Sequence, residues 1–256
     1  MKKFIALLLA VLMVLSLAAC ASKEAASGKS SIKTVTDGVL TMSTNAAFPP
    51  YEMVADDGSF EGIDVEIAGA IAEKLGLKLQ VDDMDFDAAL LAAQSGKSDI
   101  VMAGVSKTPE REEVMSFSNT YATGVQVVIV PEDSDVTLDN LGEKKIGTQT
   151  GTTGYIYCCD DYGDANVIAY DNGASAVQAL LNGQVDCVVI DNMPAQEFVK
   201  ANAGLKILDT EYVVEEYAIG MGKDNTALQT AVNDALKALT EDGTVDKIIA
   251  KYINAN

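Results

Sequence analysis

The chain has 256 residues with 38 acidic and 18 basic side chains, no histidine, and a net charge of −20 at neutral pH. This charge excludes nucleic acid and acidic surfaces as expected partners, because no basic stripe is present to contact phosphates. The length is sufficient for one large core or for two lobes of ordinary domain size.

The first twenty residues are typical of an export signal. Two lysines precede the apolar run FIALLLAVLMVLSLAA, which is too short and too early for an ordinary membrane span. The run ends in LAAC, which resembles the lipobox of bacterial lipoproteins, where the cysteine, here Cys20, carries the lipid. The alternative is an ordinary cleavage site with a chance cysteine. We expect a lipoprotein signal peptide at 1–20, a small and polar flexible tether at 21–36, and a mature protein anchored by acyl chains to the outer face of the cell membrane, or periplasmic.

Short apolar strands alternate with helices from residue 38 onward. In the first half we predict strands at 38–45, 77–84 and 99–106, and helices at 62–76 and 86–96. Further strands are predicted at 124–130, 145–150, 166–170 and 186–191, with helices at 173–183 and, broken at Gly243, at 225–253. Apolar strands that alternate with helices indicate parallel sheets covered on both faces, so the predicted class is α/β.

A partial internal repeat divides the chain. The segment AAQSGKSDIVMAG at 92–104 matches ALLNGQVDCVVID at 179–191, with Gly96 opposite Gly183 and Asp99 opposite Asp186. Each copy contains a helix end, a glycine stop, a short turn and a buried strand. The repeat predicts two similar lobes, each an open α/β sheet that binds ligands beyond the carboxyl ends of its strands.

Arg111 is the only arginine in the chain. It follows Thr108, a candidate helix N-cap, and Pro109, which suits the first helical position. The positive end of a helix disfavours a cation there, so Arg111 needs a compensating partner. One explanation is a surface pair with Glu112 or Glu113; the other is a bound anion.

The second copy of the repeat ends on Asp191, so facing lobes would bring a cation and an anion to one cleft. Arg111 could bind a carboxylate bidentately and Asp191 an ammonium group. This arrangement fits an α-amino acid bound as a zwitterion. Asp191 could also serve only as the N-cap of the helix that follows.

Several motifs together resemble the bacterial extracellular solute-binding proteins of family 3, the amino-acid receptors of ABC importers. They are FPPYE (48–52), GIDVEIAGAIAEKLG (62–76), LAAQSGKSDIVMAG (91–104), TPERE (108–112), FSNTY (117–121), IGTQTGTTG (146–154), ALLNGQVDCVVID (179–191) and EDGTVDKIIAKY (241–252). The resemblance covers residues 37–256 and implies a two-lobed periplasmic-binding-protein fold, each lobe an open, mostly parallel sheet flanked by helices and joined by two hinge strands. It places lobe 1 at 37–123, completed by 217–256, and lobe 2 at 124–216.

The resemblance also implies a set of ligand-binding residues. Phe48 and Phe86 would pack on the ligand side chain, although each could equally belong to the core. Asn45 occupies a place where many relatives carry Asp, which holds a polar or cationic side chain. The remaining candidates for the ammonium and carboxylate contacts are Ala103, Gly104, Ser106, Arg111, Gln149, Gly151, Thr152, Thr153 and Asp191.

We expect a polar uncharged ligand such as glutamine or cystine, because Asn45 removes an anion that would favour lysine or arginine. Basic amino acids remain an alternative, since Glu52 and the general acidity could attract them. The expected partners are the amino acid and a membrane permease, with the protein itself a monomer. We expect no enzymatic activity, cofactor or metal, because no histidine is present and Cys158, Cys159 and Cys187 form no metal-binding motif. An exported dehydratase-type enzyme on the same fold and a ligand sensor for a signalling partner are the competing hypotheses.

Overall fold

The computed structural model describes residues 32–209 and 211–253. The predicted signal peptide, the lipid-attachment residue Cys20 and most of the predicted tether lie outside these residues, so those expectations remain predictions. No helix in the described part combines the length and apolarity required to span a membrane.

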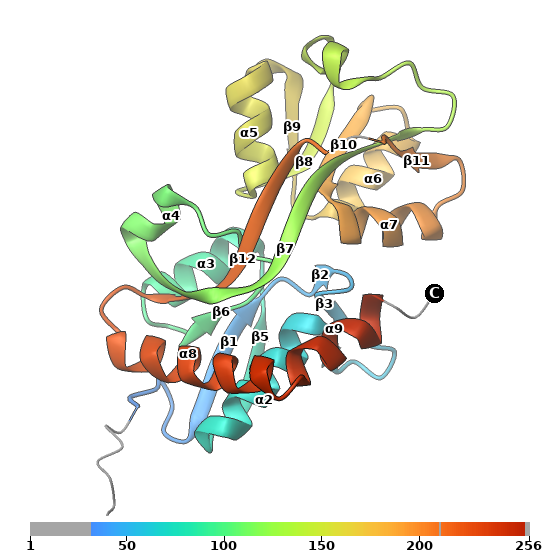
Figure 1. Ribbon diagram of the computed structural model, residues 1–256. Helices are drawn as coiled ribbons and strands as arrows, with labels where there is room; N and C mark the ends of the chain where they lie inside the picture. The colour runs from blue at the N-terminus through green and yellow to red at the C-terminus, as the bar shows by residue number, and fades with distance from the viewer. Residues whose placement is uncertain (1–31, 210, 254–256) are drawn as a thin grey trace, which may run out of the picture. The chain divides into compact units, whose positions relative to one another are not determined.

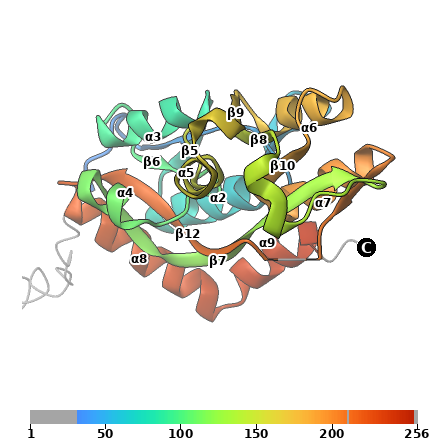
Figure 2. The ribbon, with the colours of Figure 1, turned by 90° about the horizontal axis from the view of Figure 1, so that it is seen from above.

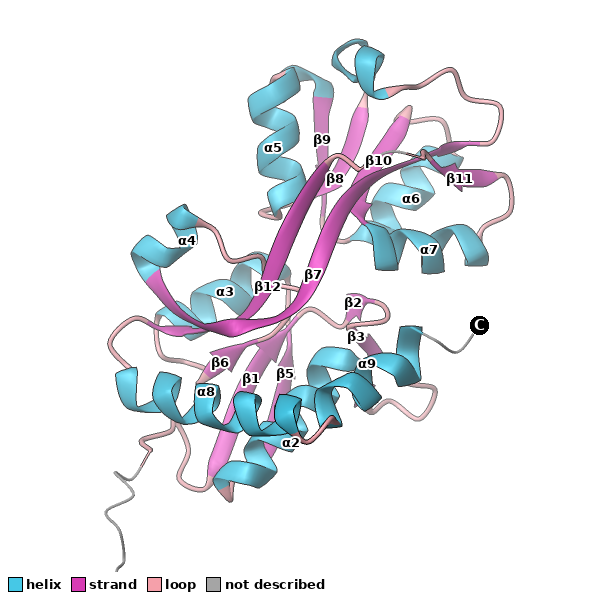
Figure 3. Ribbon diagram, viewed as in Figure 1, coloured by secondary structure: helices cyan, strands magenta, loops and turns pink. Residues whose placement is uncertain are grey.

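Nine of the described strands form one continuous sheet, and two of them are much longer than the rest. The order is β5 (Lys78–Asp83), β1 (Val39–Thr44), β6 (Ile100–Val101), β12 (Val213–Gly222), β7 (Met115–Pro131), β10 (Cys187–Asp191), β8 (Ile146–Gln149) and β9 (Val167–Tyr170), with β11 (Leu205–Ile207) beside β7. The long strands β7 and β12 run antiparallel side by side (Figures 1 and 3). They separate two parallel groups, β5-β1-β6 in lobe 1 and β10-β8-β9 in lobe 2.

Helices cover the parallel strands in each lobe. In lobe 1, α2 (Ile63–Leu75) packs against α8 (Thr226–Glu241) and α9 (Thr244–Ile253), while α3 (Phe86–Gln94) packs against β1 and β12. Figure 2 shows α3 and α8 on opposite sides of the lobe. In lobe 2, α5 (Thr153–Tyr162), α6 (Gly173–Leu181) and α7 (Asn192–Ala201) contact the strands. A small antiparallel sheet is formed by β2 (Ala47–Phe48), β3 (Glu52–Val54) and β4 (Phe60–Glu61).

Each lobe has its own apolar core. In lobe 1, Leu90, Val101 and Val105 pack with Phe117; in lobe 2, Val128, Leu141 and Ile146 pack with Val189. The predicted α/β class and two-lobed architecture are therefore confirmed. The residue numbers at which we divide the lobes, 123/124 and 216/217, stay a prediction.

The internal repeat corresponds to two equivalent units of structure. α3 and β6 in lobe 1 match α6 and β10 in lobe 2. In the first unit Asp99 accepts the backbone N–H of Thr41 at 2.8 Å, and in the second Asp186 accepts that of Lys145 at 2.7 Å. The aspartate of the repeat therefore fastens the turn before each strand to the neighbouring chain segment.

Two strand predictions differ from the structure. The predicted strand 99–106 is wrong in its second half, since β6 ends at Val101. Beyond it the chain turns at Gly104, whose φ is 55° and whose N–H donates to the Asp64 carboxylate at 2.9 Å, so the backbone leaves the sheet. The predicted strand 124–130 is only part of β7, which begins nine residues earlier because β12 continues to pair with it.

Candidate functional site

A cavity with about 330 Å³ of empty space, part of it open to solvent, lies between elements of the two lobes. It brings together eleven of the twelve residues that the sequence predicted for ligand binding, and adds Glu52. The lining residues are Asn45, Phe48, Glu52, Phe86, Ala103, Gly104, Ser106, Arg111, Gln149, Thr152, Thr153 and Asp191. The twelfth candidate, Gly151, is absent from the lining but contacts Arg111.

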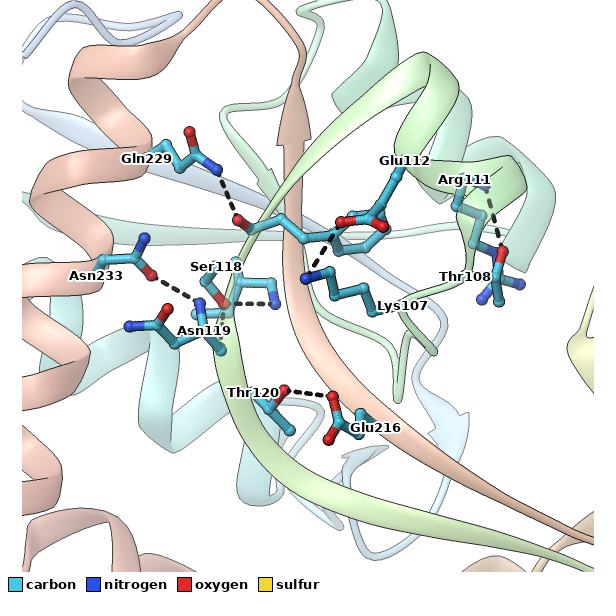
Figure 4. A network of polar contacts seen from close by, with 12 residues as sticks. Lys107, Thr108, Arg111, Glu112, Ser118, Asn119, Thr120, Glu216, Gln229 and Asn233 are labelled. Atoms are coloured by element: carbon cyan, nitrogen blue, oxygen red, sulfur yellow. Dashed lines mark hydrogen bonds and ion pairs between the residues drawn. The ribbon is translucent and has the colours of Figure 1, made fainter.

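Arg111 lies in the first turn of α4 (Pro109–Val114), and its side chain is buried. Thr108 caps this helix, accepting the backbone N–H of Arg111 at 3.3 Å (Figure 4). The guanidinium donates to the carbonyl oxygens of Ser106 and Gly151, at 2.8 and 3.2 Å, and lies 5.4 Å from the Phe86 ring centre. Burial lowers its pKa, an effect opposed first by the charge of Glu215.

The surface-pair explanation for Arg111 is wrong. Glu112 pairs instead with Lys107, at 3.1 Å (Figure 4), and Arg111 makes no ion pair within residues 32–209 and 211–253. A buried guanidinium with only carbonyl acceptors retains its full charge and has unused capacity for an anion. This is the state expected of a carboxylate-binding arginine.

Hydrogen bonds between described residues of the two lobes lie around the cavity. Besides the bond from Arg111 to Gly151, Gln149 Nε2 donates to Asn45 Oδ1 at 3.0 Å, and the Ser106 and Thr153 hydroxyls are 3.4 Å apart. Asn45 is held in place because its own amide donates to the Met84 carbonyl at 3.0 Å. Its side chain is therefore oriented with both polar atoms in use.

Thr152 and Thr153 begin α5, and their hydroxyls have different partners. The Thr152 hydroxyl donates to the Gln149 carbonyl at 2.8 Å and accepts the N–H of Tyr155, so it acts as the N-cap. The Thr153 hydroxyl donates to Glu215 at 2.9 Å. The N-terminus of α5 nonetheless lies at the cavity, where free backbone N–H groups favour an anion.

Asp191 ends β10 at the cavity. It occupies the N-cap position of α7, but its side chain makes no capping hydrogen bond. The carboxylate instead accepts from Gln126 Nε2 at 2.9 Å and from the Tyr217 hydroxyl. Burial raises the pKa of Asp191 to about 7, although these two hydrogen bonds lower it. The explanation that Asp191 serves only as a helix N-cap is therefore wrong, because its side chain makes no capping hydrogen bond.

Phe48 and Phe86 are each both cavity wall and buried packing. Phe86 belongs to the core of lobe 1, and Phe48 stacks on Tyr51 with ring centres 5.9 Å apart. Gly104 permits Phe48 to approach, because a Cβ at Gly104 would lie 2.7 Å from the Phe48 ring. Both residues therefore belong to the buried packing and to the cavity wall, and their contact with a ligand side chain stays a prediction.

Glu52 is fully buried and lines the cavity, and neither of its oxygens accepts a hydrogen bond from a described residue. Burial, then the charge of neighbouring Asp64 and a hydrogen bond to the Asp64 carboxylate, raise the pKa of Glu52 well above the ordinary value. Asp64 itself accepts from Gly104 and from the Tyr121 hydroxyl, at 2.9 and 2.7 Å, while burial raises its pKa to about 6.

Sequence reasoning missed Gln126 and Glu215 behind the cavity wall. Gln126 Nε2 donates to Asp191 Oδ2 at 2.9 Å and to Glu215 Oε2 at 2.8 Å, and both residues are buried. Strand alternation could have indicated that one of the adjacent Glu215 and Glu216 points inward. It could not have indicated which, because the two are chemically identical.

Cys158, Cys159 and Cys187 are free cysteines. Within the described ranges, no group of three or more acidic, cysteine or histidine side chains could hold a metal ion.

Comparison with known proteins agrees with the fold. The chain is 33% identical to a probable histidine-binding protein of Neisseria gonorrhoeae, over 98% of this chain and 96% of that protein. It is 30% identical to the ABC transporter arginine-binding protein 1 of Escherichia coli K12, over 82% and 88%. A solved structure of an ancestral arginine-binding protein bound to glutamine aligns with a TM-score of 0.80 at 38% identity, over 85% of this chain and 99% of that one. Residues 40–255 match one family throughout, and the chain belongs to the bacterial extracellular solute-binding proteins, family 3.

Proposed function

We propose that this protein captures a basic amino acid, with arginine as the first candidate, and delivers it to the permease of an ABC transporter. The observation that carries the choice of ligand is Glu52, a fully buried carboxyl group that lines the cavity and accepts no hydrogen bond from a described residue. The names of the histidine- and arginine-binding relatives support the same class of ligand. This choice replaces the polar uncharged ligand favoured from the sequence.

The backbone end of the ligand is assigned to residues from both lobes. Its carboxylate would accept from Arg111 and from the N-terminal N–H groups of α5, and its ammonium would donate to Asp191. These partners belong to different lobes, so a bound amino acid stabilises the arrangement in which the lobes meet. Ligand-driven closure of this kind is what a receptor for a permease requires.

The side chain of the ligand is assigned to Phe48, Phe86 and Glu52. A planar guanidinium can stack on an aromatic ring, and both phenylalanine rings line the cavity. Glu52 keeps its proton while the cavity holds no cation, because burial disfavours its charged form. A cationic side chain reverses this preference and would give the ionised Glu52 oxygens a hydrogen-bond donor.

Isothermal titration calorimetry tests the proposal with arginine, lysine, histidine, glutamine and cystine as separate ligands. We expect arginine to bind tightest, and Glu52→Gln to weaken arginine at least about tenfold, roughly 1.4 kcal/mol, since it removes a buried counter-charge. Glu73→Gln is the control, because it makes the same charge change at an exposed position of α2. Unchanged arginine affinity in Glu52→Gln would contradict the assignment.

Glutamine or cystine is the second candidate, and the amides of Asn45 and Gln149 favour it. Both line the cavity and are hydrogen-bonded to each other, so an amide-bearing ligand could exchange with that bond. The ancestral arginine-binding protein bound to glutamine shows that a relative accepts such a ligand. Tighter binding of glutamine or cystine than of any basic amino acid would select this candidate.

Export, lipid anchoring at Cys20 and a monomeric state complete the proposal and rest on the sequence. A Cys20→Ala variant that still incorporates labelled palmitate would contradict the anchor. The dehydratase-type alternative is checked by mass spectrometry of the ligand after incubation, which should show no turnover.

A further inference from the structure

Glu215 is a buried acid on β12, one of the two long strands that connect the lobes. Only 7% of its surface is exposed, whereas the adjacent Glu216 is exposed and accepts from Thr120 at 3.1 Å (Figure 4). Glu215 does not line the cavity itself. It reaches the cavity wall through Thr153, whose hydroxyl donates to it at 2.9 Å.

A single amide holds Glu215 next to Asp191. Gln126 Nε2 donates one hydrogen bond to each carboxylate, at 2.8 Å to Glu215 and 2.9 Å to Asp191. The two acids therefore lie on either side of one nitrogen atom. An amide donor satisfies their oxygens without cancelling their charge, so two acids remain close together in a poorly solvated place.

Glu215 makes no ion pair with a described residue. Its Oε1 atom is buried without a hydrogen-bond partner among the described residues. Its charge opposes the lowering of the Arg111 pKa by burial. Glu215 also adds to burial in raising the pKa of Asp191 to about 7 and that of Tyr157 to about 12. Arg111 is the only cation of the cavity wall and makes no described ion pair.

Counting charges shows what Glu215 adds to the site. The ligand carboxylate would neutralise Arg111, and the ligand ammonium would neutralise Asp191. Glu215 then remains as a buried anion near the bound molecule, besides Glu52 at the side-chain end. Only a ligand with a net positive charge benefits from it, because for a neutral zwitterion the attraction of the ammonium and the repulsion of the carboxylate largely cancel.

We propose that Glu215 is a specificity residue that selects ligands by net charge, acting through the electric field at the cavity without touching the ligand. Gln126 is the positioning residue that keeps Glu215 beside Asp191. This inference rests on the proposed function, since it concerns how the same site prefers a cationic amino acid over a neutral one.

The test compares the affinities of arginine and citrulline, which have nearly the same shape but differ by one charge. In Glu215→Gln we expect the arginine-to-citrulline ratio to fall at least about fivefold, with citrulline affinity within about twofold of wild type, because only the charge is lost. Gln at 215 can still accept from Gln126 and Thr153, and a thermal melt checks that the variant is folded. A Glu216→Gln control makes the same charge change on the exposed face and should leave the ratio unchanged.

Two outcomes would overturn the inference. One is an unchanged arginine-to-citrulline ratio in folded Glu215→Gln, and an equal loss of both affinities would then indicate a purely structural role. The other is a loss of the preference for arginine in Glu215→Asp, which keeps the charge and tests the inference even if Glu215→Gln fails to fold. If the wild type binds no basic amino acid, the proposed function fails first, and that result is separate from these.

Discussion

Arg111 carries the most specific prediction at the scale of single residues. Replacing it by alanine should weaken binding of the amino acid at least about a hundredfold, roughly 3 kcal/mol, because the ligand carboxylate would then be buried without its cation. Isothermal titration of wild type and Arg111→Ala measures this loss. Lys107→Ala is the matched control, since it removes a nearby cation that pairs only with Glu112 on the surface. Similar affinities for wild type and Arg111→Ala would end the carboxylate assignment.

Residue identity determined how much of the site could be predicted. Arg111 was identifiable because it is chemically alone in a chain that otherwise uses lysine. Glu215 could not be identified in the same way, because burial depends on which face of β12 meets Gln126, and that register is set by pairing with β7. The importance of Glu52 for the choice of ligand could not be judged from the sequence either, because only the fold shows that its carboxyl group is fully buried.

At the scale of elements, glycine stops and helix caps were reliable signals, and strand lengths were not. The helix predicted at 62–76 ends at Gly76, which has the left-handed conformation, and Thr108 caps α4 as predicted. Local residues decide such ends, so they can be read from the sequence. The lengths of β6 and β7 are set by how far the neighbouring strands pair with them. The three residues of β11 could not be predicted as a strand, because a short edge strand depends on pairing with its neighbour, here β7.

The loop between β8 and α5 provides a prediction at this scale. Gly151 has a φ of 73°, and a Cβ there would lie 1.6 Å from Asp87 Oδ1 in α3. Gly151→Ala should therefore weaken arginine binding by about tenfold, because either Asp87 moves or the loop withdraws and loses its bond to Arg111. Calorimetric titration at one temperature measures the change.

Gly163→Ala separates the steric effect from backbone strain. Gly163 has a φ of 82° but nothing within 4 Å of its Cβ position, so its variant should lose stability without losing affinity. Adding Asp87→Ala to Gly151→Ala should restore part of the affinity, since it removes the obstructing side chain. Full affinity in Gly151→Ala alone would mean that the two lobes do not need this close approach.

At the scale of the whole molecule, the acidic composition and the buried carboxyl groups act in the same direction. The net charge of −20 opposes a compact state when all acids are ionised. Glu52, Asp64 and Asp191 add to this, because each is buried and has a raised pKa. Without a bound cationic ligand, the folded state is therefore least stable when these groups are charged. The buried acids of the binding site therefore lower the stability of the ligand-free protein and at the same time favour the binding of a cation.

This reasoning fixes the sign of the pH dependence. Folded pKa values of about 6 for Asp64 and about 7 for Asp191 lie above the ordinary 3.8, so the folded state binds more protons than the unfolded state between these limits. Stability is then largest on the acidic side and falls as the pH rises to about 7. Groups with lowered pKa values, such as Asp242 at about 2, have finished titrating below pH 5 and do not disturb this window.

Thermal melts of the ligand-free protein should accordingly give a higher Tm at pH 5 than at pH 8. Saturating arginine should reduce or reverse the difference, because its cationic groups favour the ionised forms of Glu52 and Asp191 and so stabilise the folded state more at pH 8. Asp191→Asn should flatten the ligand-free profile, since it removes the carboxyl whose pKa is about 7. A Tm that rises from pH 5 to pH 8 without ligand would show that these carboxyls are ionised at little cost, and the electrostatic case for a cationic ligand would lose its basis.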